Sequence, residues 1–362
     1  MLKLASKIPF YWGFRYLGFP RILPVNLTFS VTGHCNSRCQ TCKIWEMQKS
    51  QGDDLSVNEY EKIFQSLGTT PYWVTLSGGE PFLRKDLDKI CAILAKICRP
   101  SIINIPTNGL LSAVIPNKVE EILDSVGSKT KLVINLSLDG IGEKHDEIRG
   151  VKGNFEKSIE TYNELRKIKN LQFTLGVHTV ISKFNVTEIP EIYNYVEDSL
   201  KPDQYITEIA EQRVELGTLD ENLSPSINDY TKAVDFLCSK IKKKKFTGLA
   251  KVTEAFRLEY YEMVKWMLRE QRRPIPCYAG FASGQVSSDG EVWGCCIKAE
   301  SMGNLREADY DFKKIWFSKK GNEIRSHVRH DGCFCPLANA SYTNMLLHPP
   351  TLAKVSWRFL VG

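Results

Sequence analysis

The sequence predicts an α/β fold built on a parallel sheet. Short apolar runs rich in β-forming residues recur up to residue 209, and amphipathic helical patterns separate them. Strands that alternate with helices form a parallel sheet with right-handed crossovers, which is either open or curled into a partial barrel. The predicted strands are 25–31, 72–76, 102–106, 132–138, 173–181 and 204–209.

Local signals for helices and turns support this alternation. Ser56 stands before an amphipathic run and Glu59 follows it in the pattern of a capping box, which predicts a helix that ends near Gly68. Much later in the chain, Asp289-Gly290 predicts the turn of a β-hairpin. The other predicted helices are 86–97, 155–168, 226–245 and 251–271.

The charge balance argues against a nucleic-acid binder. The chain has 362 residues, 43% of them hydrophobic, which is enough for one large domain and a smaller appendage. Its 48 Lys and Arg against 42 Asp and Glu give a net charge of +6, and we interpret the one dense basic run, Lys242 to Lys245, as a solvated helix face. No apolar stretch reaches the roughly 18 residues of a membrane span. We therefore expect a soluble or peripheral protein without a nucleic-acid partner.

The cysteine content points to metal ligation. The chain has 11 cysteines and no cleavable signal sequence, which favours a reducing, cytoplasmic location over a disulfide framework. Cys91, Cys98 and Cys238 lie in helical patterns, where buried free cysteines are expected. The other cysteines form two groups, one near each end of the chain.

The two ends of the chain differ in composition from the part between them. At the start, Lys3, Lys7, Arg15 and Arg21 are interleaved with six aromatic residues, as in interfacial amphipathic helices. A helix packed on the protein's own surface would have the same composition. From residue 274 on, turn residues and cysteines become frequent. We therefore expect three parts, 1–24, 25–272 and 273–362.

The first cysteine group, Cys35, Cys39 and Cys42, lies on a loop predicted to follow the first strand. Three thiolates cannot complete a tetrahedral structural zinc site, which needs four ligands, but they can bind three irons of a four-iron four-sulfur cluster. The fourth iron stays open, as a chelating cosubstrate requires if an electron is to pass directly to it. Half of a zinc site and three unrelated loop cysteines are the alternatives.

The motif GHCNSRCQTC, residues 33–42, resembles the CxxxCxxC signature of the radical S-adenosylmethionine (SAM) superfamily. The resemblance implies a partial (β/α)6 barrel and a cluster whose open iron binds the amino and carboxylate groups of SAM. Reduction of that cluster in the family releases a 5′-deoxyadenosyl radical. Thr41 is a departure, because the family commonly has an aromatic residue before the last cysteine.

A glycine-rich motif follows the second predicted strand, at the sheet edge where ligands of α/β proteins bind. Its sequence is Ser77-Gly78-Gly79-Glu80-Pro81, and its glycines allow the backbone to approach a ligand closely. By itself the motif would be an ordinary turn. After a three-cysteine loop it resembles the GGEP motif of the superfamily, which implies that Gly78 to Pro81 bind the methionine end of SAM, with Glu80 or exposed carbonyls accepting from the ammonium group.

Polar residues also end the next two predicted strands. Asn108 follows the third strand, and Ser137 and Asp139 belong to an SLDG motif after the fourth. Simple turn chemistry explains either loop in isolation. The SLDG motif, followed by Arg149-Gly150, resembles the fourth-strand region of radical SAM enzymes with C-terminal extensions. It implies that Asn108, Ser137 and Asp139 are candidate SAM contacts. Arg149 either pairs with the SAM carboxylate or forms a surface salt bridge.

A charged segment follows the sixth predicted strand, from Glu208 to Glu215. If it faces the rim of the barrel, it could bind a polar substrate or transfer a proton. A solvated loop is the interpretation that we prefer. His178, within the fifth strand, is interpreted as a core histidine, so the sequence assigns no catalytic side chain.

The second cysteine group comprises Cys277, Cys295, Cys296, Cys333 and Cys335. Its order resembles the twitch domain, the short relative of the SPASM extension, in which four cysteines hold an auxiliary four-iron four-sulfur cluster. The resemblance implies ligation by Cys277, Cys295, Cys333 and Cys335, with Cys296 as the alternative to Cys295. Cys333 and Cys335 are separated by one residue, whereas two residues are common between these cysteines in the family. A four-cysteine zinc site has the same ligand count, and unligated thiols are a further alternative.

Together the motifs predict a radical SAM oxidoreductase or modifying enzyme with an auxiliary cluster. Residues 25–272 would form the radical SAM core, and 273–362 the SPASM/twitch-like domain. The expected partners are an electron donor such as ferredoxin or flavodoxin, a peptide, sugar, alcohol or lipid-linked substrate, and a membrane surface for residues 1–24. The alternative is a non-catalytic iron–sulfur electron carrier or scaffold, which would have no need of the SAM motifs.

Overall fold

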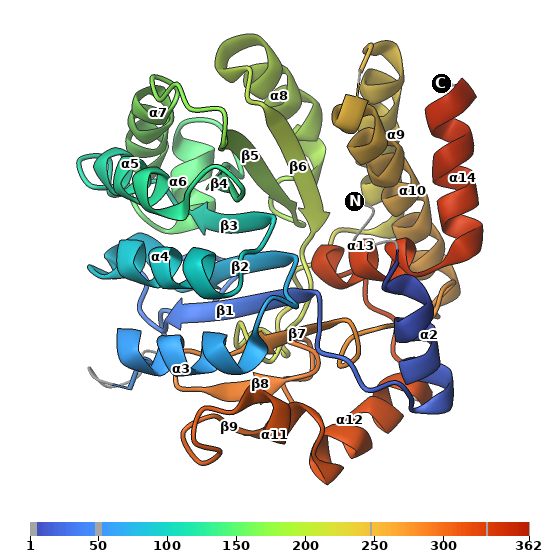
Figure 1. Ribbon diagram of the computed structural model, residues 1–362. Helices are drawn as coiled ribbons and strands as arrows, with labels where there is room; N and C mark the ends of the chain where they lie inside the picture. Colours follow the sequence, from blue (N-terminus) through green and yellow to red (C-terminus); the bar gives the residue numbers. More distant parts are fainter. Residues whose placement is uncertain (1–5, 48–52, 247, 331, 362) are drawn as a thin grey trace.

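The computed structural model describes residues 6–47, 53–246, 248–330 and 332–361 (Figure 1). It confirms the predicted α/β fold, because six parallel strands pair in sequence order and curve into a partial barrel. The strands are β1 (Asn26–Thr32), β2 (Trp73–Gly78), β3 (Ile102–Thr107), β4 (Lys131–Ser137), β5 (Phe173–Ile181) and β6 (Gln204–Ile209). Their parallel direction places all six carboxyl ends at one rim.

Helices that follow the strands cover the outer face of the sheet (Figure 1). The predicted capping box is confirmed, since Ser56 N donates to the Glu59 carboxylate at 2.7 Å and Glu59 N donates to Ser56 Oγ at 3.4 Å. The helices are α3 (Val57–Leu67), α4 (Leu87–Ile97), α5 (Ile115–Val126), α6 (Glu143–Arg149), α7 (Asn154–Leu165) and α8 (Ile189–Tyr195), with short turns η1 (Pro81–Leu83), η2 (Val186–Glu188) and η3 (Val196–Leu200).

The core lies between the sheet and these helices. Phe29 of β1 is fully buried, and its ring meets Phe64 of α3 edge to face with centroids 5.5 Å apart. Cys91 and Cys98 are buried in this core and Cys238 is buried nearby, as predicted. Apolar residues on the inner faces of α3, α4 and α5 meet the sheet in the same way, so the spacing of apolar residues positions the helices.

The C-terminal part extends the same sheet. β7 (Ser283–Val286) pairs in parallel with β1, and β8 (Glu291–Trp293) and β9 (Ser301–Asn304) continue in antiparallel register. The hairpin predicted at Asp289-Gly290 joins β7 to β8, and Gly290 has a positive φ of 93° there. The boundary near residue 272 stays a prediction. The nine-stranded sheet nevertheless makes the C-terminal part continuous with the barrel.

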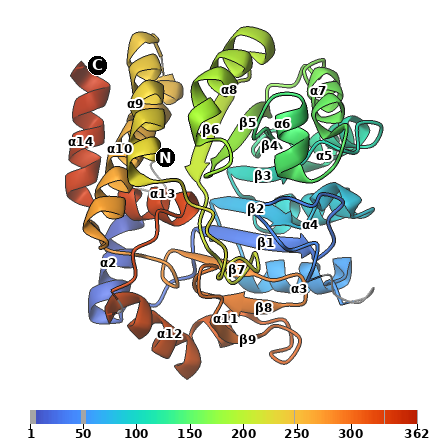
Figure 2. The same ribbon diagram turned by 180° about the vertical axis from the view of Figure 1, so that it is seen from behind.

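The remaining helices flank the open side of the barrel and the C-terminal strands. In both views α9, α10 and α14 lie side by side (Figures 1 and 2). None of the helices within the described ranges is long and apolar enough to span a membrane. These helices are α9 (Ile227–Lys243), α10 (Gly248–Glu270), α11 (Phe312–Trp316), α12 (Lys319–His330), α13 (Ala338–Leu346) and α14 (Pro349–Val361).

The N-terminal segment contains one helix, α2 (Ile8–Leu17), which packs on the C-terminal part; residues 1–5 lie outside the described residues. Tyr11 is fully buried, and Trp12 Nε1 donates to the Leu347 carbonyl at 2.7 Å. The interpretation as a packed surface helix is therefore confirmed. One side of the segment stays uncovered, since Leu17 is 82% and Phe19 74% exposed.

Candidate active site

The three-cysteine loop follows β1 at the carboxyl rim and is held there by the loop after β2. Gly79 N donates to the Thr32 carbonyl at 2.9 Å, and Glu80 N donates to the His34 carbonyl at 2.8 Å. A Cβ atom on Gly79 would lie 1.9 Å from the His34 carbonyl oxygen. The sequence suggested that these glycines admit a ligand. In the structure Gly79 admits the cysteine loop itself, which only a residue without a side chain permits.

Glu80 ties the ends of two strands together. Its carboxylate accepts from Thr107 Oγ1 and Asn108 N, each at 2.8 Å, and from Phe82 N at 3.2 Å. Burial raises the pKa of Glu80 to about 7. Both carboxylate oxygens thus bond to donors of the chain itself. A direct contact from Glu80 to SAM stays a prediction.

Asn108 joins the loop after β3 to the cysteine loop. Its Nδ2 donates to Asn36 Oδ1 at 2.7 Å and lies 4.0 Å from Cys35 Sγ. Ser158 of α7 donates to the Asn108 carbonyl at 2.9 Å. The polar side chain expected at this rim is therefore beside the first cysteine.

The carboxyl end of α6 supports the other half of the cysteine loop. Arg38 N donates to the Arg149 carbonyl at 2.9 Å, and Gln40 N donates to the Ile148 carbonyl at 2.8 Å. The last carbonyls of a helix have no hydrogen-bond donors within the helix, and here N–H groups of the cysteine loop are the donors. Gly150 allows this contact, since a Cβ atom there would lie 2.3 Å from the Arg38 carbonyl oxygen.

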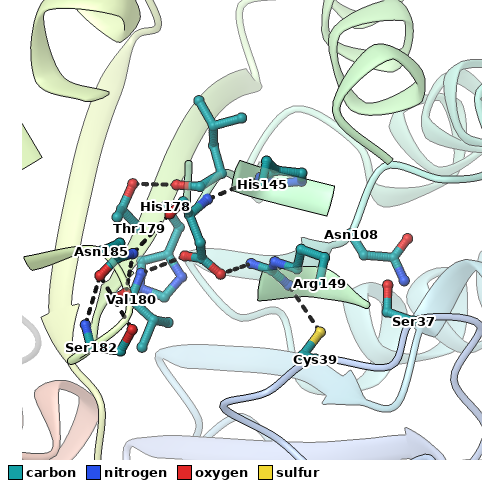
Figure 3. Close-up of polar contacts among 12 residues, drawn as sticks. Ser37, Cys39, Asn108, His145, Arg149, His178, Thr179, Val180, Ser182 and Asn185 are labelled. Carbon is teal, nitrogen blue, oxygen red and sulfur yellow. Dashed lines mark hydrogen bonds and ion pairs between the residues drawn. The ribbon is translucent and has the colours of Figure 1, made fainter. Parts of the chain in front are cut away.

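Arg149 and Asp139 form a buried ion pair beside Cys39 (Figure 3). Arg149 Nη2 lies 2.7 Å from Asp139 Oδ2, and the two side chains are only 11% and 1% exposed. Arg149 Nη1 donates to Cys39 Sγ at 3.7 Å. The interpretation of Arg149 as a surface salt bridge is therefore wrong, because its partner lies inside the protein.

Three neighbours fix the position of Asp139. Its Oδ1 accepts from Val180 N at 2.8 Å, its carbonyl accepts from Asn185 Nδ2 at 2.9 Å, and its N–H faces His145 Nδ1 at 3.2 Å (Figure 3). Burial lowers the pKa of His145 to about 4, so its ring is neutral and Nδ1 can accept. The SLDG loop is thereby joined to β5 and α6.

Ser137, the last residue of β4, lies opposite His178 within β5. His178 Nε2 is 3.6 Å from Glu208 Oε1 in β6, so this histidine has a carboxylate neighbour. The rim between β4 and β6 thus carries a hydroxyl, an imidazole and a carboxylate.

The segment after β6 is only partly solvated, since Gln212 is exposed whereas Glu211 is buried and Arg213 is half-buried. The expected solvated loop is therefore wrong for its charged residues. Glu211 is 8% exposed, and neither of its carboxylate oxygens has a hydrogen-bond partner within the described part of the chain. Burial raises the pKa of Glu211 to about 8, although the charge of Arg213 opposes the shift. The polar sequence predicted solvent exposure, but the C-terminal part contacts this segment through Ile297 and Gln285.

This segment also connects the two cysteine groups. Lys43 N, just after Cys42, donates to the Leu216 carbonyl at 2.9 Å, and Val214 N donates to the Ile297 carbonyl at 3.0 Å. The Glu215 carboxylate accepts from Gln285 of β7. Residues 210–218, called the bridging loop below, therefore contact both cysteine-bearing loops.

The second cysteine group surrounds one cavity. Cys277, Cys295, Cys333 and Cys335 all line it, together with apolar side chains of α10 and α12. Cys296 does not line this cavity, and it packs with Leu337 and Ala340 in a small cluster that Cys335 also contacts. The adjacent cysteines therefore face different surroundings, which the sequence could not distinguish.

Comparison with known proteins identifies the family. The profile of the radical SAM superfamily matches residues 29–196, and that of the SPASM iron–sulfur cluster-binding domain matches 277–336. The chain belongs to the radical SAM superfamily. Its SPASM match includes both ends of the second cysteine group, Cys277 and Cys335.

Two relatives and one solved structure illustrate the range of this family. The chain is 27% identical to Fe-coproporphyrin III synthase of Methanosarcina barkeri, covering 80% of this chain and 73% of the relative. It is 22% identical to the sporulation killing factor maturation protein SkfB of Bacillus subtilis, covering 79% of this chain and 63% of the relative. Streptococcus suis SuiB bound to SAM shares the fold, with a TM-score of 0.62 and 16% identity over 84% of this chain and 68% of that one.

The cofactors of the family are a SAM-binding four-iron four-sulfur cluster and an auxiliary iron–sulfur cluster, and the cysteine surroundings fit such groups. Burial raises the pKa of Cys35 to about 11 and that of Cys42 to about 12, so these thiols need nearby positive charge to ionise. Iron and the Arg149 guanidinium would supply it. Within the described ranges no three His, Cys, Asp or Glu side chains share a single-ion site. Cluster thiolates bind different irons and so lie farther apart.

The buried neutral His145 should make folding stability depend on pH. Burial lowers its pKa from 6.5 to about 4, so between these values the unfolded chain binds a proton that the folded chain does not. Stability should therefore fall as the pH falls through this window, by about 1.4 kcal/mol per unit at most. In urea unfolding, the free energy of unfolding should be lower at about pH 5 than at about pH 7. His145→Gln should reduce this difference by about 2 kcal/mol.

The exposed His330 at the end of α12 provides the matched control. His330→Gln should retain the wild-type pH dependence. If the free energy of unfolding changed with pH equally in wild type and His145→Gln, the assignment of a buried neutral imidazole would be contradicted.

Proposed function

We propose that this radical SAM enzyme cleaves SAM to a 5′-deoxyadenosyl radical, which abstracts a hydrogen atom from a substrate held between the two cysteine groups. The observation that carries the proposal is the docking of the three-cysteine loop against the glycine motif after β2 and the end of α6. The bound cluster supplies the electron for SAM cleavage. An electron carrier or scaffold, the alternative function, would need no such arrangement of SAM motifs around its cysteines.

In this proposal each motif at the rim has its own role. Cys35, Cys39 and Cys42 hold three irons and leave the fourth for SAM. The motif Gly78 to Pro81 is the proposed site of the ammonium group, and Asn108 and Ser137 border the same rim as candidate contacts to the rest of SAM. Asp139 bonds to Val180 N and Arg149 and would act through Arg149.

The bridging loop is the proposed substrate contact. It lies between the two cysteine groups and carries the buried, unpartnered carboxyl of Glu211. The names of the relatives indicate a tetrapyrrole in one case and a peptide in another, and SuiB has been solved with its precursor peptide SuiA. A peptide or another polar molecule is the substrate class we infer here. A ferredoxin or flavodoxin is the proposed electron donor.

Loss of any cysteine of the first group should abolish SAM cleavage. Cys39→Ala, like Cys35→Ala and Cys42→Ala, should lose about four irons per chain and all 5′-deoxyadenosine production with dithionite. Because the ligands lie on a loop, the circular dichroism spectrum should be unchanged. Cys91→Ala, a buried cysteine outside both groups, is the control that should keep iron and cleavage. Full cleavage by a first-group variant would refute the proposed function.

The second cysteine group should distinguish Cys295 from Cys296. Cys295 lines the cavity with Cys277, Cys333 and Cys335, so Cys295→Ala should remove about four of about eight irons. Cys296→Ala should retain them. Cleavage of SAM without substrate should survive in both, since it occurs at the first group. Loss of iron from Cys296→Ala, with iron retained in Cys295→Ala, would show that Cys296 is the ligand.

We also propose that the exposed side of the N-terminal segment contacts a membrane surface. Leu17 and Phe19 project from it, with Arg21 close by in sequence, as in interfacial helices. Leu17→Ser with Phe19→Ser should reduce sedimentation with anionic vesicles severalfold. Leu171→Ser removes an equally exposed leucine elsewhere and should have no effect. Wild-type protein that never sediments would show that the segment only packs on the fold.

A further inference from the structure

A positive charge stands directly beside one sulfur of the first cysteine group. Arg149 Nη1 donates to Cys39 Sγ at 3.7 Å, and the arginine lies inside the protein, where few waters weaken its field. An arginine guanidinium is not deprotonated in proteins, so Arg149 carries its charge at this position.

Asp139 determines where the guanidinium points. One amino group of Arg149 is taken by Asp139 Oδ2, which leaves the other directed at Cys39 (Figure 3). Asp139 itself is fixed by Val180 N and by Asn185. The contact between arginine and sulfur is thus built by three elements, β4, β5 and α6, and does not depend on a flexible surface side chain.

We propose that Arg149, oriented by Asp139, is a positioning residue that stabilises negative charge on the Cys39 sulfur and so raises the reduction potential of the bound cluster. Adding an electron makes the cluster more negative, and a nearby cation favours that state. Hydrogen bonds to cluster sulfurs act in the same direction. The inference rests on the proposed function only in placing a cluster at Cys35, Cys39 and Cys42.

The resemblance to the superfamily offered a different role for Arg149, as the partner of the SAM carboxylate. The two roles predict different measurements. Charge stabilisation at Cys39 acts in the absence of SAM, whereas a carboxylate partner affects only SAM binding.

The test is a redox titration followed by electron paramagnetic resonance, without SAM. It uses full-length protein carrying Cys277→Ala and Cys335→Ala, so that about four irons per chain report on the first cluster alone. Arg149→Met should lower the ratio of reduced to oxidised cluster about tenfold at a fixed potential, or about 59 mV for a one-electron couple. Arg149→Lys, which keeps the charge, should recover most of this loss.

Arg166→Met is the matched control, because it breaks the exposed ion pair with Asp203 and should leave the potential unchanged. If Arg149→Met does not load iron, iron loading is compared in Arg149→Gln and Arg149→Lys. Iron in the lysine variant but not in the glutamine variant supports a role for the positive charge. If neither variant loads iron, the site requires the shape of the guanidinium group, and the proposal is overturned.

An unchanged potential together with weaker SAM binding in the Arg149 variants would make Arg149 a SAM ligand and overturn the inference. That result would leave the proposed function standing. Wild-type protein that forms no cluster at the three cysteines would instead refute the proposed function, so the two failures are distinguishable.

Discussion

The close backbone contact between the glycine motif and the cysteine loop is the constraint on which the site depends. Gly79 lies so near the His34 carbonyl that a side chain there would collide with it. This contact fixes one end of the cysteine loop, and hydrogen bonds to the end of α6 fix the other. Because both anchors are backbone groups on rigid elements, the three thiols have defined positions before any cluster binds.

Much of the barrel could be predicted because its signals are local. Each strand is a short apolar run, and the capping box needs only Ser56 and Glu59, three residues apart. The pairing of β7 with β1 could not be predicted, since hydrogen-bond partners in a sheet are chosen by tertiary packing. The burial of Arg149 was missed for the same reason: its partners Cys39 and Asp139 are brought to it by different elements.

The bridging loop shows how composition misleads about burial. Its charged residues predict solvent exposure when the sequence is read alone. In the structure Arg213 of this loop lies 3.8 Å from Glu208 of β6, so part of the charge is compensated within the protein. Glu211 has no hydrogen-bond partner among the described residues. A buried polar group without a partner is costly, and such groups are retained mainly where they have a function.

The continuous sheet determines how the two cysteine groups relate to each other. β1 leads directly into the first group, and β7, its parallel neighbour, leads through the β8 hairpin to Cys295. Hydrogen-bonded strands of one sheet resist sliding past each other, so the two groups belong to one rigid frame. The bridging loop joins both cysteine loops to this frame. In the proposed function this loop contacts the substrate, so its side chains could change substrate choice while the framework that places the cysteines stays the same.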